Sequence, residues 1–382
     1  MINRQSYFNV TKRLVVKVGS NVLTADQGLN LPVIYALSMQ ISRLMKDGIE
    51  VLLVSSGAMA SGQKKIGLTH RPDEIPKRQA VAAVGQTGLM MDYEKAFAVY
   101  DVKVAQILLT GDDLSSGRDR YLNARNTMNT LLSWKILPII NENDTVVVEE
   151  IRFGDNDNLS AMITLLMNAD MLINLTDING LYSGDPRSSD DVELISEVTA
   201  IDADIERIAG NIPGALGTGG MLAKIKAAAK VVNAGIPMII ANGQETDILL
   251  KLVSGENVGT FFVPAAEKLS SRKCWIGYNV KLKGTIRIDA GASRAILEHG
   301  KSLLPGGIID VEGDFGVGEA VELVDHNGVH LANGLVNYTA ADIRKIMGCK
   351  TDQIAECLGQ KLYDEVIHRD NLTILNECFV GE

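Results

Sequence analysis

Short, almost continuous apolar runs alternate with longer amphipathic stretches from the N-terminus to Phe262. The long stretches repeat apolar residues every three or four positions, as a half-buried helix does, whereas the short runs are typical of buried strands. This alternation predicts an α/β fold, with an open, mostly parallel sheet sandwiched by helices. The predicted strands are Leu14–Val18, Val51–Val54, Val102–Leu109, Ile136–Ile140, Met171–Leu175 and Pro237–Ala241. The predicted helices are Val33–Lys46, Arg78–Phe97, Ala124–Trp134, Leu159–Met167 and Met221–Asn233.

The pattern changes near residue 263. A polar, Ala- and Ser-rich segment from Pro264 to Arg272 has the composition of a linker, and short strands with glycine turns follow it. After the last of these strands, Asn327-Gly328 is a hairpin signal. The strands expected here are Gly284–Ile288, Ile308–Val311 and Ala320–Val324. We therefore predict a domain at residues 1–263, a linker at 264–275 and a small β-rich domain with one or two helices at 276–382.

Composition and charge narrow the classes of protein. The 382 residues are 46% hydrophobic and carry a net charge of −10, which disfavours nucleic acid or an anionic membrane as the main partner. The segment Met1–Lys12 lacks the apolar core of a signal peptide, and no run approaches the roughly 18 apolar residues of a membrane span. The four cysteines show no CxxC spacing, so neither zinc nor a disulfide framework is indicated. We expect a cytoplasmic protein.

Two predicted strands end in turns with the chemistry of a phosphate site. The first delivers Lys17, Gly19 and Ser20, and the second delivers Ser56 and Gly57. Glycine allows close approach to backbone N–H groups, and lysine supplies positive charge. Because ligands gather at the carboxyl ends of parallel strands, we expect both turns to line one anion site. The alternative is an ordinary solvated lysine at the end of a strand.

A third glycine cluster, Gly217 to Gly220, precedes a predicted helix that carries Lys224 in its first turn. Backbone amides at a helix N-terminus favour anions, so this lysine is a second candidate phosphate ligand. The alternative is a flexible loop with an exposed lysine. Three glycine turns and two lysines together favour a nucleotide-phosphate site.

Gly154-Asp155-Asn156-Asp157-Asn158 places two carboxylates and two carboxamides before another predicted helix. Asp and Asn cap helices well, but one cap needs only one such residue, so the excess points to function. A generous N-cap on a surface turn remains the alternative. A calcium loop is disfavoured, because Leu159 and Ser160 stand where a third oxygen ligand and a glycine are required.

Other motifs are absent or incomplete. Gly300-Lys301-Ser302 looks like the end of a Walker A loop, but Ala295 replaces the earlier glycine. Neither a nucleophile elbow nor a dinucleotide fingerprint is present, which argues against hydrolases and dehydrogenases. The only histidine before the linker, His70, lies in no motif. An alcohol acceptor would need a base, whereas a carboxylate acceptor would not, because its pKa is about 4.

The chain resembles the glutamate 5-kinases of the amino acid kinase superfamily, and its C-terminal segment resembles the PUA domain of many bacterial members. Six segments carry the resemblance in order along the chain. They are LVVKVGSN (Leu14–Asn21), VSSGAMASG (Val54–Gly62), INENDTV (Ile140–Val146), FGDNDNLSA (Phe153–Ala161), LTDINGLYSGDPR (Leu175–Arg187) and GTGGMLAK (Gly217–Lys224).

The resemblance implies phosphorylation of the γ-carboxylate of L-glutamate by ATP with Mg²⁺, the first step of proline synthesis. It also implies feedback inhibition by proline, coupling to glutamyl phosphate reductase and a homo-oligomer, either dimer or tetramer. The matching catalytic residues are Lys17, Asp157 and Lys224. The matching glutamate-binding residues are Ser56, Gly57, Asp144 and Asn156. The matching nucleotide-binding residues are Lys17, Gly19, Ser20, Thr176, Asp177, Thr218, Gly219, Gly220, Met221, Leu222, Ala223 and Lys224. The residues that hold Mg²⁺ are not indicated.

Two rival classes share part of this pattern. A sister kinase acting on aspartate, N-acetylglutamate, carbamate or UMP would share the lysines and glycines. A non-catalytic sensor or RNA-binding module would need basic patches or altered lysine positions. From Ile276 onward the chain has 10 Lys and Arg against 16 Asp and Glu, so RNA binding is not expected of the C-terminal domain.

Overall fold

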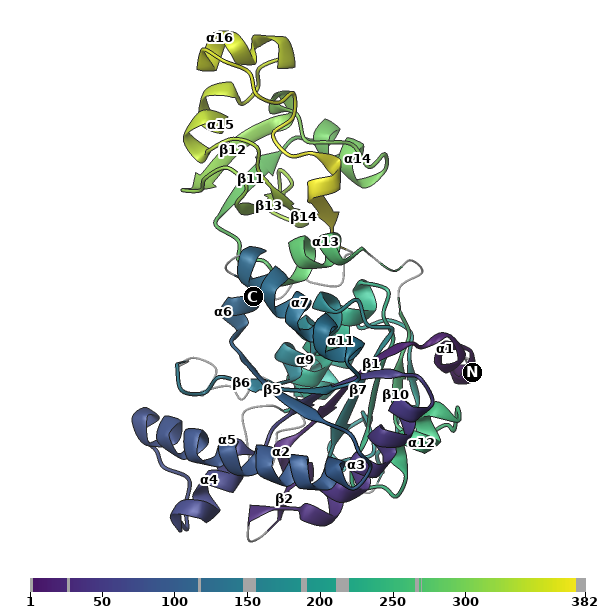
Figure 1. Cartoon of the computed structure of the whole chain (residues 1–382). Coiled ribbons are helices and arrows are strands. Elements are labelled where there is room, and N and C mark those ends of the chain that lie inside the picture. The colour runs from purple at the N-terminus through teal and green to yellow at the C-terminus, as the bar shows by residue number, and fades with distance from the viewer. Residues whose placement is uncertain are drawn as a thin grey trace. The chain divides into compact units, whose positions relative to one another are not determined.

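A computed structural model describes residues 3–25, 28–115, 118–146, 156–186, 191–210, 220–264, 268 and 270–375. The chain forms two compact units, whose elements Figure 1 labels. The first unit comprises Met1–Asp113 and Asp119–Lys268, and the second comprises Leu114–Arg118 and Leu269–Glu382. The domain limits at residues 263 and 276, with the linker between them, stay a prediction.

The first unit is built on an eight-stranded sheet in the order β5-β6-β4-β1-β7-β9-β10-β8. Among the described strands of this sheet, only the pairing of β9 with β10 is antiparallel. The predicted mostly parallel sheet is therefore confirmed. In sheet order the strands are β5 (Val104–Leu109), β6 (Leu137–Glu142), β4 (Glu50–Ser55), β1 (Arg13–Val18), β7 (Met171–Thr176), β9 (Met238–Asn242), β10 (Thr260–Phe262) and β8 (Glu197–Val198).

The central strands are buried along their whole length rather than on alternate residues. All six residues of β7 are buried, and so are the last five of both β1 and β4. Helices cover both faces of a parallel sheet, so both sets of side chains lie in apolar surroundings. This explains why the strands are continuous apolar runs in the sequence.

Figure 1 shows helices on both faces of the sheet, with α9 and α11 on one side and α3 and α5 on the other. All five predicted helices are present. Helix α5 begins at Ile75, before the predicted start at Arg78, and its first turn accommodates Pro76, because the N–H that proline lacks has no acceptor within the helix there. None of the helices in the described ranges is long and apolar enough to cross a membrane. The five helices are α3 (Leu31–Lys46), α5 (Ile75–Ala98), α7 (Arg118–Ser133), α9 (Asn156–Leu166) and α11 (Met221–Asn233).

A helical hairpin follows β4 and depends on two glycines. Helix α4 (Ala58–Ile66) packs on α5 so closely that a Cβ at Gly62 would lie 1.9 Å from the carbonyl oxygen of Val81. A Cβ at Gly85 would lie 1.7 Å from the carbonyl oxygen of Ala58. Only glycine permits this contact, which holds α4 and the turn before it against α5.

The second unit contains a five-stranded sheet in the order β12-β11-β13-β14-β15. Its core includes Ile286, Ile288, Val321 and Leu323, all fully buried. The Asn-Gly signal is confirmed, since Asp325 N donates to Val329 O at 2.9 Å and Gly328 has a φ of 88°. The strands are β12 (Ile308–Gly313), β11 (Gly284–Ile288), β13 (Ala320–Val324), β14 (His330–Leu335) and β15 (Leu372–Ile374).

The prediction of one or two helices at residues 276–382 was wrong, because the described part of that range contains three: α14 (Ala290–Leu297), α15 (Ala340–Ile346) and α16 (Ile354–Leu358). Before them lie α13 (Ser271–Cys274), within the predicted linker, and a π-helix, η1, at Trp275–Asn279. Each is only one or two turns long, which is too short for an apolar repeat to stand out in the sequence.

Candidate active site

Three charged side chains from different elements meet at the carboxyl edge of the large sheet. Lys17 lies near the end of β1, Asp157 in the first turn of α9 and Lys224 in the first turn of α11. The ammonium group of Lys17 donates to Oδ1 of Asp157, and that of Lys224 donates to Oδ2 at 3.1 Å. These residues are only 4%, 1% and 7% exposed. The fold thus brings together the three residues that the resemblance implied are catalytic.

The electrostatics of this group favour an ionised carboxylate. Burial of Asp157 raises its pKa, but the charges of Lys17 and Lys224 and hydrogen bonds from Lys17 and Asn174 outweigh that effect. The net result is a pKa well below the usual range. Asp157 therefore stays negative at neutral pH and can hold two ammonium groups in fixed positions.

Asn174 is part of this group and was missed in the sequence. Its Nδ2 donates to Asp157 Oδ1 at 2.8 Å from the middle of β7. The sequence feature that could have indicated Asn174 is its position inside the apolar run Leu172 to Leu175. A polar group buried in such a strand requires a hydrogen-bond partner.

A second network of carboxamides lies beside the first. Asn156 Nδ2 donates to Ser56 Oγ at 2.9 Å and to Asn141 Oδ1 at 3.0 Å. Asn141 Nδ2 in turn donates to Gln86 Oε1 at 2.8 Å. With its NH₂ group engaged, Asn156 keeps a buried Oδ1 that accepts no hydrogen bond within the described part of the chain. This network offers an acceptor to a ligand. No sequence pattern indicated Gln86 as part of it.

Asp144 and Gly57 lie in the turns after β6 and β4. Burial raises the pKa of Asp144 to about 6, while the positive charge of Arg71 opposes the rise. Gly57 is the N-cap residue before α4 and has a φ of 106°, a conformation that a β-carbon disfavours. Arg71 was not indicated in the sequence, because it precedes a proline in a polar stretch without a motif.

The turn after β1 lies beside Lys17. Gly19 N donates to the carbonyl oxygen of Leu175 at 3.0 Å, which ties this turn to β7. A β-carbon at Gly19 would lie 3.7 Å from Lys17 Nζ. That distance is an ordinary van der Waals contact, so the turn lies directly beside the ammonium group. Ser20 follows as the first residue of α2 (Ser20–Leu23).

The turn after β7 carries Thr176 and Asp177. Thr176 Oγ1 donates to Asp177 Oδ1 at 3.0 Å, and Asn21 Nδ2 donates to Asp177 Oδ2 at 2.9 Å. The carboxylate of Asp177 is thus oriented by groups from two neighbouring turns.

Helix α11 begins at Met221 after Gly220, as predicted, and Leu222 and Ala223 complete its first turn with Lys224. Thr218 and Gly219 lie outside the described residues, as do Gly154 and Asp155 of the acidic cluster.

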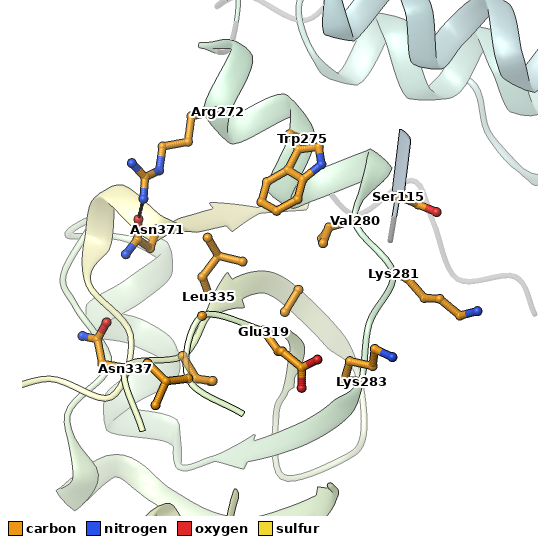
Figure 2. A pocket seen from close by; sticks show the side chains of 14 residues that line it. Ser115, Arg272, Trp275, Val280, Lys281, Lys283, Glu319, Leu335, Asn337 and Asn371 are labelled. Carbon is orange, nitrogen blue, oxygen red and sulfur yellow. Dashed lines mark hydrogen bonds between the residues drawn. The ribbon is translucent and has the colours of Figure 1, made fainter. Parts of the chain in front are cut away.

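A cavity of about 380 Å³ lies in the second unit. Figure 2 shows Arg272 bonded to Asn371 on one side, Lys281 and Lys283 on the other, and Trp275 between them. Glu319 also lines this cavity, and none of the site residues predicted from the sequence does. The candidate active site is therefore the cluster in the first unit.

The chain is similar to known proteins in both of its units. The amino acid kinase family model matches residues 12–242, and the PUA domain model matches residues 284–358. Glutamate 5-kinase of Syntrophus aciditrophicus is 52% identical over 98% of this chain and 97% of its own. The protein of the same name from Caldanaerobacter subterraneus is 49% identical over 95% and 98%. Carbamate kinase from Giardia lamblia bound to AMP-PNP is 14% identical, with a TM-score of 0.49 over 67% of this chain and 99% of its own.

The sheet, the cluster at its carboxyl edge and the family model together define the class of protein. The chain belongs to the amino acid kinase family and, within it, to the glutamate 5-kinases. It is accordingly a kinase with an appended PUA domain.

Proposed function

We propose that the chain transfers the γ-phosphoryl group of ATP to the γ-carboxylate of L-glutamate, the first step of proline biosynthesis. A carboxylate oxygen forms a bond to the γ-phosphorus while the bond from that phosphorus to the β,γ-bridging oxygen breaks. ADP leaves with the electron pair, and the product is L-glutamyl 5-phosphate. One observation carries the proposal: the buried carboxylate of Asp157 binds two lysines that lie 140 residues before it and 67 residues after it in the sequence.

The cluster is suited to this transfer because the acceptor needs no base. A γ-carboxyl group with a pKa of about 4 is already ionised at neutral pH. Catalysis then consists of holding two anions in line and neutralising the charge on the phosphoryl group. Lys17 and Lys224 supply positive charge, and Asp157 keeps their ammonium groups in place.

The carboxamide network supports a glutamate site next to the lysines. An amino acid brings an α-ammonium group, which requires acceptors, and Asn156 Oδ1 and the carboxylate of Asp144 are available. Ser56 and Gly57 line the same turn after β4. We propose that the nucleotide binds next to the lysines. It would contact Gly19 and Ser20, Thr176 and Asp177, and the segment 218–224.

Mg²⁺ fits this site as a partner of the nucleotide. It binds commonly through substrate phosphates and water with few protein carboxylates. Both oxygens of Asp157 already accept hydrogen bonds from ammonium groups. The described residues contain no group of three or more His, Cys, Asp or Glu that could hold a metal ion. The ion supplies further neutralisation of phosphate charge when bound.

We extend the proposal to regulation and assembly, which the family resemblance implies. Proline acts as a feedback inhibitor, the product passes to glutamyl phosphate reductase, and the chain forms a dimer or tetramer. Val84 and Met91 lie seven residues apart on α5 and are 41% and 47% exposed, so they are candidate contacts in such an assembly. Sedimentation equilibrium measures the assembly, and a monomer at all concentrations would contradict it.

The deciding experiment is an assay of ADP release with Mg²⁺, with and without L-glutamate. Hydroxylamine is added in a second arm to trap an acyl phosphate as the hydroxamate, and proline in a third. We expect glutamate-dependent ADP release, hydroxamate formation and inhibition by proline. Aspartate, N-acetylglutamate, carbamate and UMP are run as rival acceptors, and a preference for any of them would overturn the assignment of glutamate.

A further inference from the structure

We propose that Asn174 is a positioning residue for phosphoryl transfer, which holds the carboxylate of Asp157 so that each of its oxygens faces one lysine. The inference rests on the proposed function, in which Asp157 organises Lys17 and Lys224. Asn174 itself is not placed against the substrates.

The sheet places Asn174 next to Lys17. The two residues are register partners across the parallel pair β1 and β7. Paired residues on neighbouring strands direct their side chains to the same face, so both reach toward the start of α9. Lys17 Nζ and Asn174 Nδ2 both donate to Asp157 Oδ1, the latter at 2.8 Å.

This arrangement restricts rotation of the carboxylate. The last torsion of an aspartate side chain is soft, so two mobile ammonium groups alone leave its plane poorly defined. Lysine stems are long and flexible, whereas Asn174 is short and lies on a strand paired on both sides, with β1 and with β9. Its Nδ2 is therefore a rigid donor that fixes Oδ1, and Oδ2 is left directed at Lys224.

The burial of Asn174 shows that its amide is not there for packing. The residue is 0% exposed, like its apolar neighbours Ile173 and Leu175, and an aliphatic side chain would fill such a position without polar atoms. Its Oδ1 is buried and accepts no hydrogen bond within the described residues. A buried oxygen without a hydrogen bond costs free energy of folding. We therefore attribute the presence of a carboxamide at this position to the hydrogen bond that its Nδ2 donates to Asp157.

The first test is Asn174→Ala. We expect kcat to fall about 10- to 100-fold, the loss typical of one hydrogen bond to a charged group, with the KM for glutamate and ATP nearly unchanged. Ile173→Val is the matched control on the same strand, because its side chain faces the other side of the sheet. It should lower the melting temperature slightly and leave kcat unchanged.

A second variant, Asn174→Asp, gives a readout that a purely structural role would not produce. The new carboxyl group can donate to Asp157 only when protonated, so kcat of this variant should rise relative to the unmodified enzyme as the pH falls. A kcat ratio that stays constant with pH would count against the proposal. Circular dichroism establishes that each variant is folded.

A double-mutant cycle separates failure of this inference from failure of the proposed function. Asp157→Asn alone should lower kcat strongly; if it does not, the catalytic assignment of the whole cluster is wrong. If Asp157→Asn does lower kcat strongly, then adding Asn174→Ala to that variant should lower kcat little further, because the hydrogen bond between the two residues is already altered. Additive losses, or normal kcat in Asn174→Ala, would overturn the role of Asn174 while leaving the proposed function standing.

Discussion

At the scale of single residues, the polar side chains at the start of α9 are more numerous than a helix cap requires because each makes a contact with another part of the first unit. Asn156 bonds Ser56 and Asn141, and Asp157 bonds the two lysines. Asn158 is not a plain capping residue, because its Oδ1 accepts a hydrogen bond from Lys230 of α11. Asn156, Asp157 and Asn158 therefore each bond partners outside α9, and Asp157 and Asn158 share α11 as a partner helix.

Removing either lysine tests the charge that stabilises the transferring group. Lys17→Ala or Lys224→Ala should lower kcat by about 10²- to 10³-fold or more, because a preorganised cation at the reacting group is lost. Steady-state kinetics measure the loss, and circular dichroism should show an intact fold. Lys226→Ala is the matched control, since Lys226 is exposed on the same helix, α11. Near-normal kcat in either active-site variant would remove that lysine from the mechanism.

The raised pKa of Asp144 predicts a pH dependence of glutamate binding. Its carboxyl group has a pKa of about 6 because of burial, so it becomes protonated and neutral as the pH falls through that value. A neutral group binds an α-ammonium less well, and the KM for glutamate should therefore rise below about pH 6. The KM of Asp144→Asn should be high at every pH and should lack this inflection. A KM that is flat with pH in the unmodified enzyme would exclude Asp144 as the ammonium partner.

At the scale of elements, the period of the apolar pattern was sufficient for the long helices and for six strands of the large sheet, but the short strands β8 and β10 were not predicted. The long helix α11 was predicted with its observed ends, Met221 and Asn233, because glycines precede it and its apolar face is regular. The start of α7 was predicted six residues late, at Ala124 rather than Arg118, because the first turns are polar. Polar first turns carry no apolar repeat, so they look like loop in the sequence.

The close packing of α4 on α5 is an element-level property that one methyl group should disturb. In Gly85→Ala, the new Cβ would approach the carbonyl oxygen of Ala58 to 1.7 Å, so α4 must shift. We expect destabilisation of about 1–3 kcal/mol and a higher KM for glutamate, because α4 begins at the turn with Ser56 and Gly57. Thermal unfolding and kinetics measure the two effects. Gly210→Ala is the control, since no atom of the described residues lies within 4 Å of its Cβ position. Equal behaviour of the two variants would contradict the packing account.

At the scale of the whole molecule, the site exists because of the strand order. Lys17 and Asp157 are 140 residues apart, and Asp157 and Lys224 are 67 apart. Strand β1 lies between β4 and β7, so the turns after three strands that are distant in sequence open at one edge. The second unit has its own sheet and core and contributes none of the residues proposed for catalysis.

RNA binding tests the role of the second unit. Its sequence from Ile276 onward has an excess of acidic residues, so we expect no salt-sensitive tRNA binding at micromolar protein in a gel shift. If tRNA did bind, the cavity lined by Trp275, Lys281 and Lys283 would be the candidate binding site. If tRNA does bind, and Lys281→Ala with Lys283→Ala abolishes the shift, the PUA domain is an RNA-binding module after all.

The sequence by itself determined the layers of the fold and, to within two residues, six strands of the large sheet with the residue types near their ends, because these depend on local period and composition. It also identified Lys17, Asp157 and Lys224, through resemblance to a family. Only the tertiary structure decided which oxygen of Asp157 each lysine takes, and that Asn174, Gln86 and Arg71 lie beside the candidate site. The physical reason is that such contacts join residues far apart in the chain, and their geometry follows from strand register and helix packing, which no local pattern records.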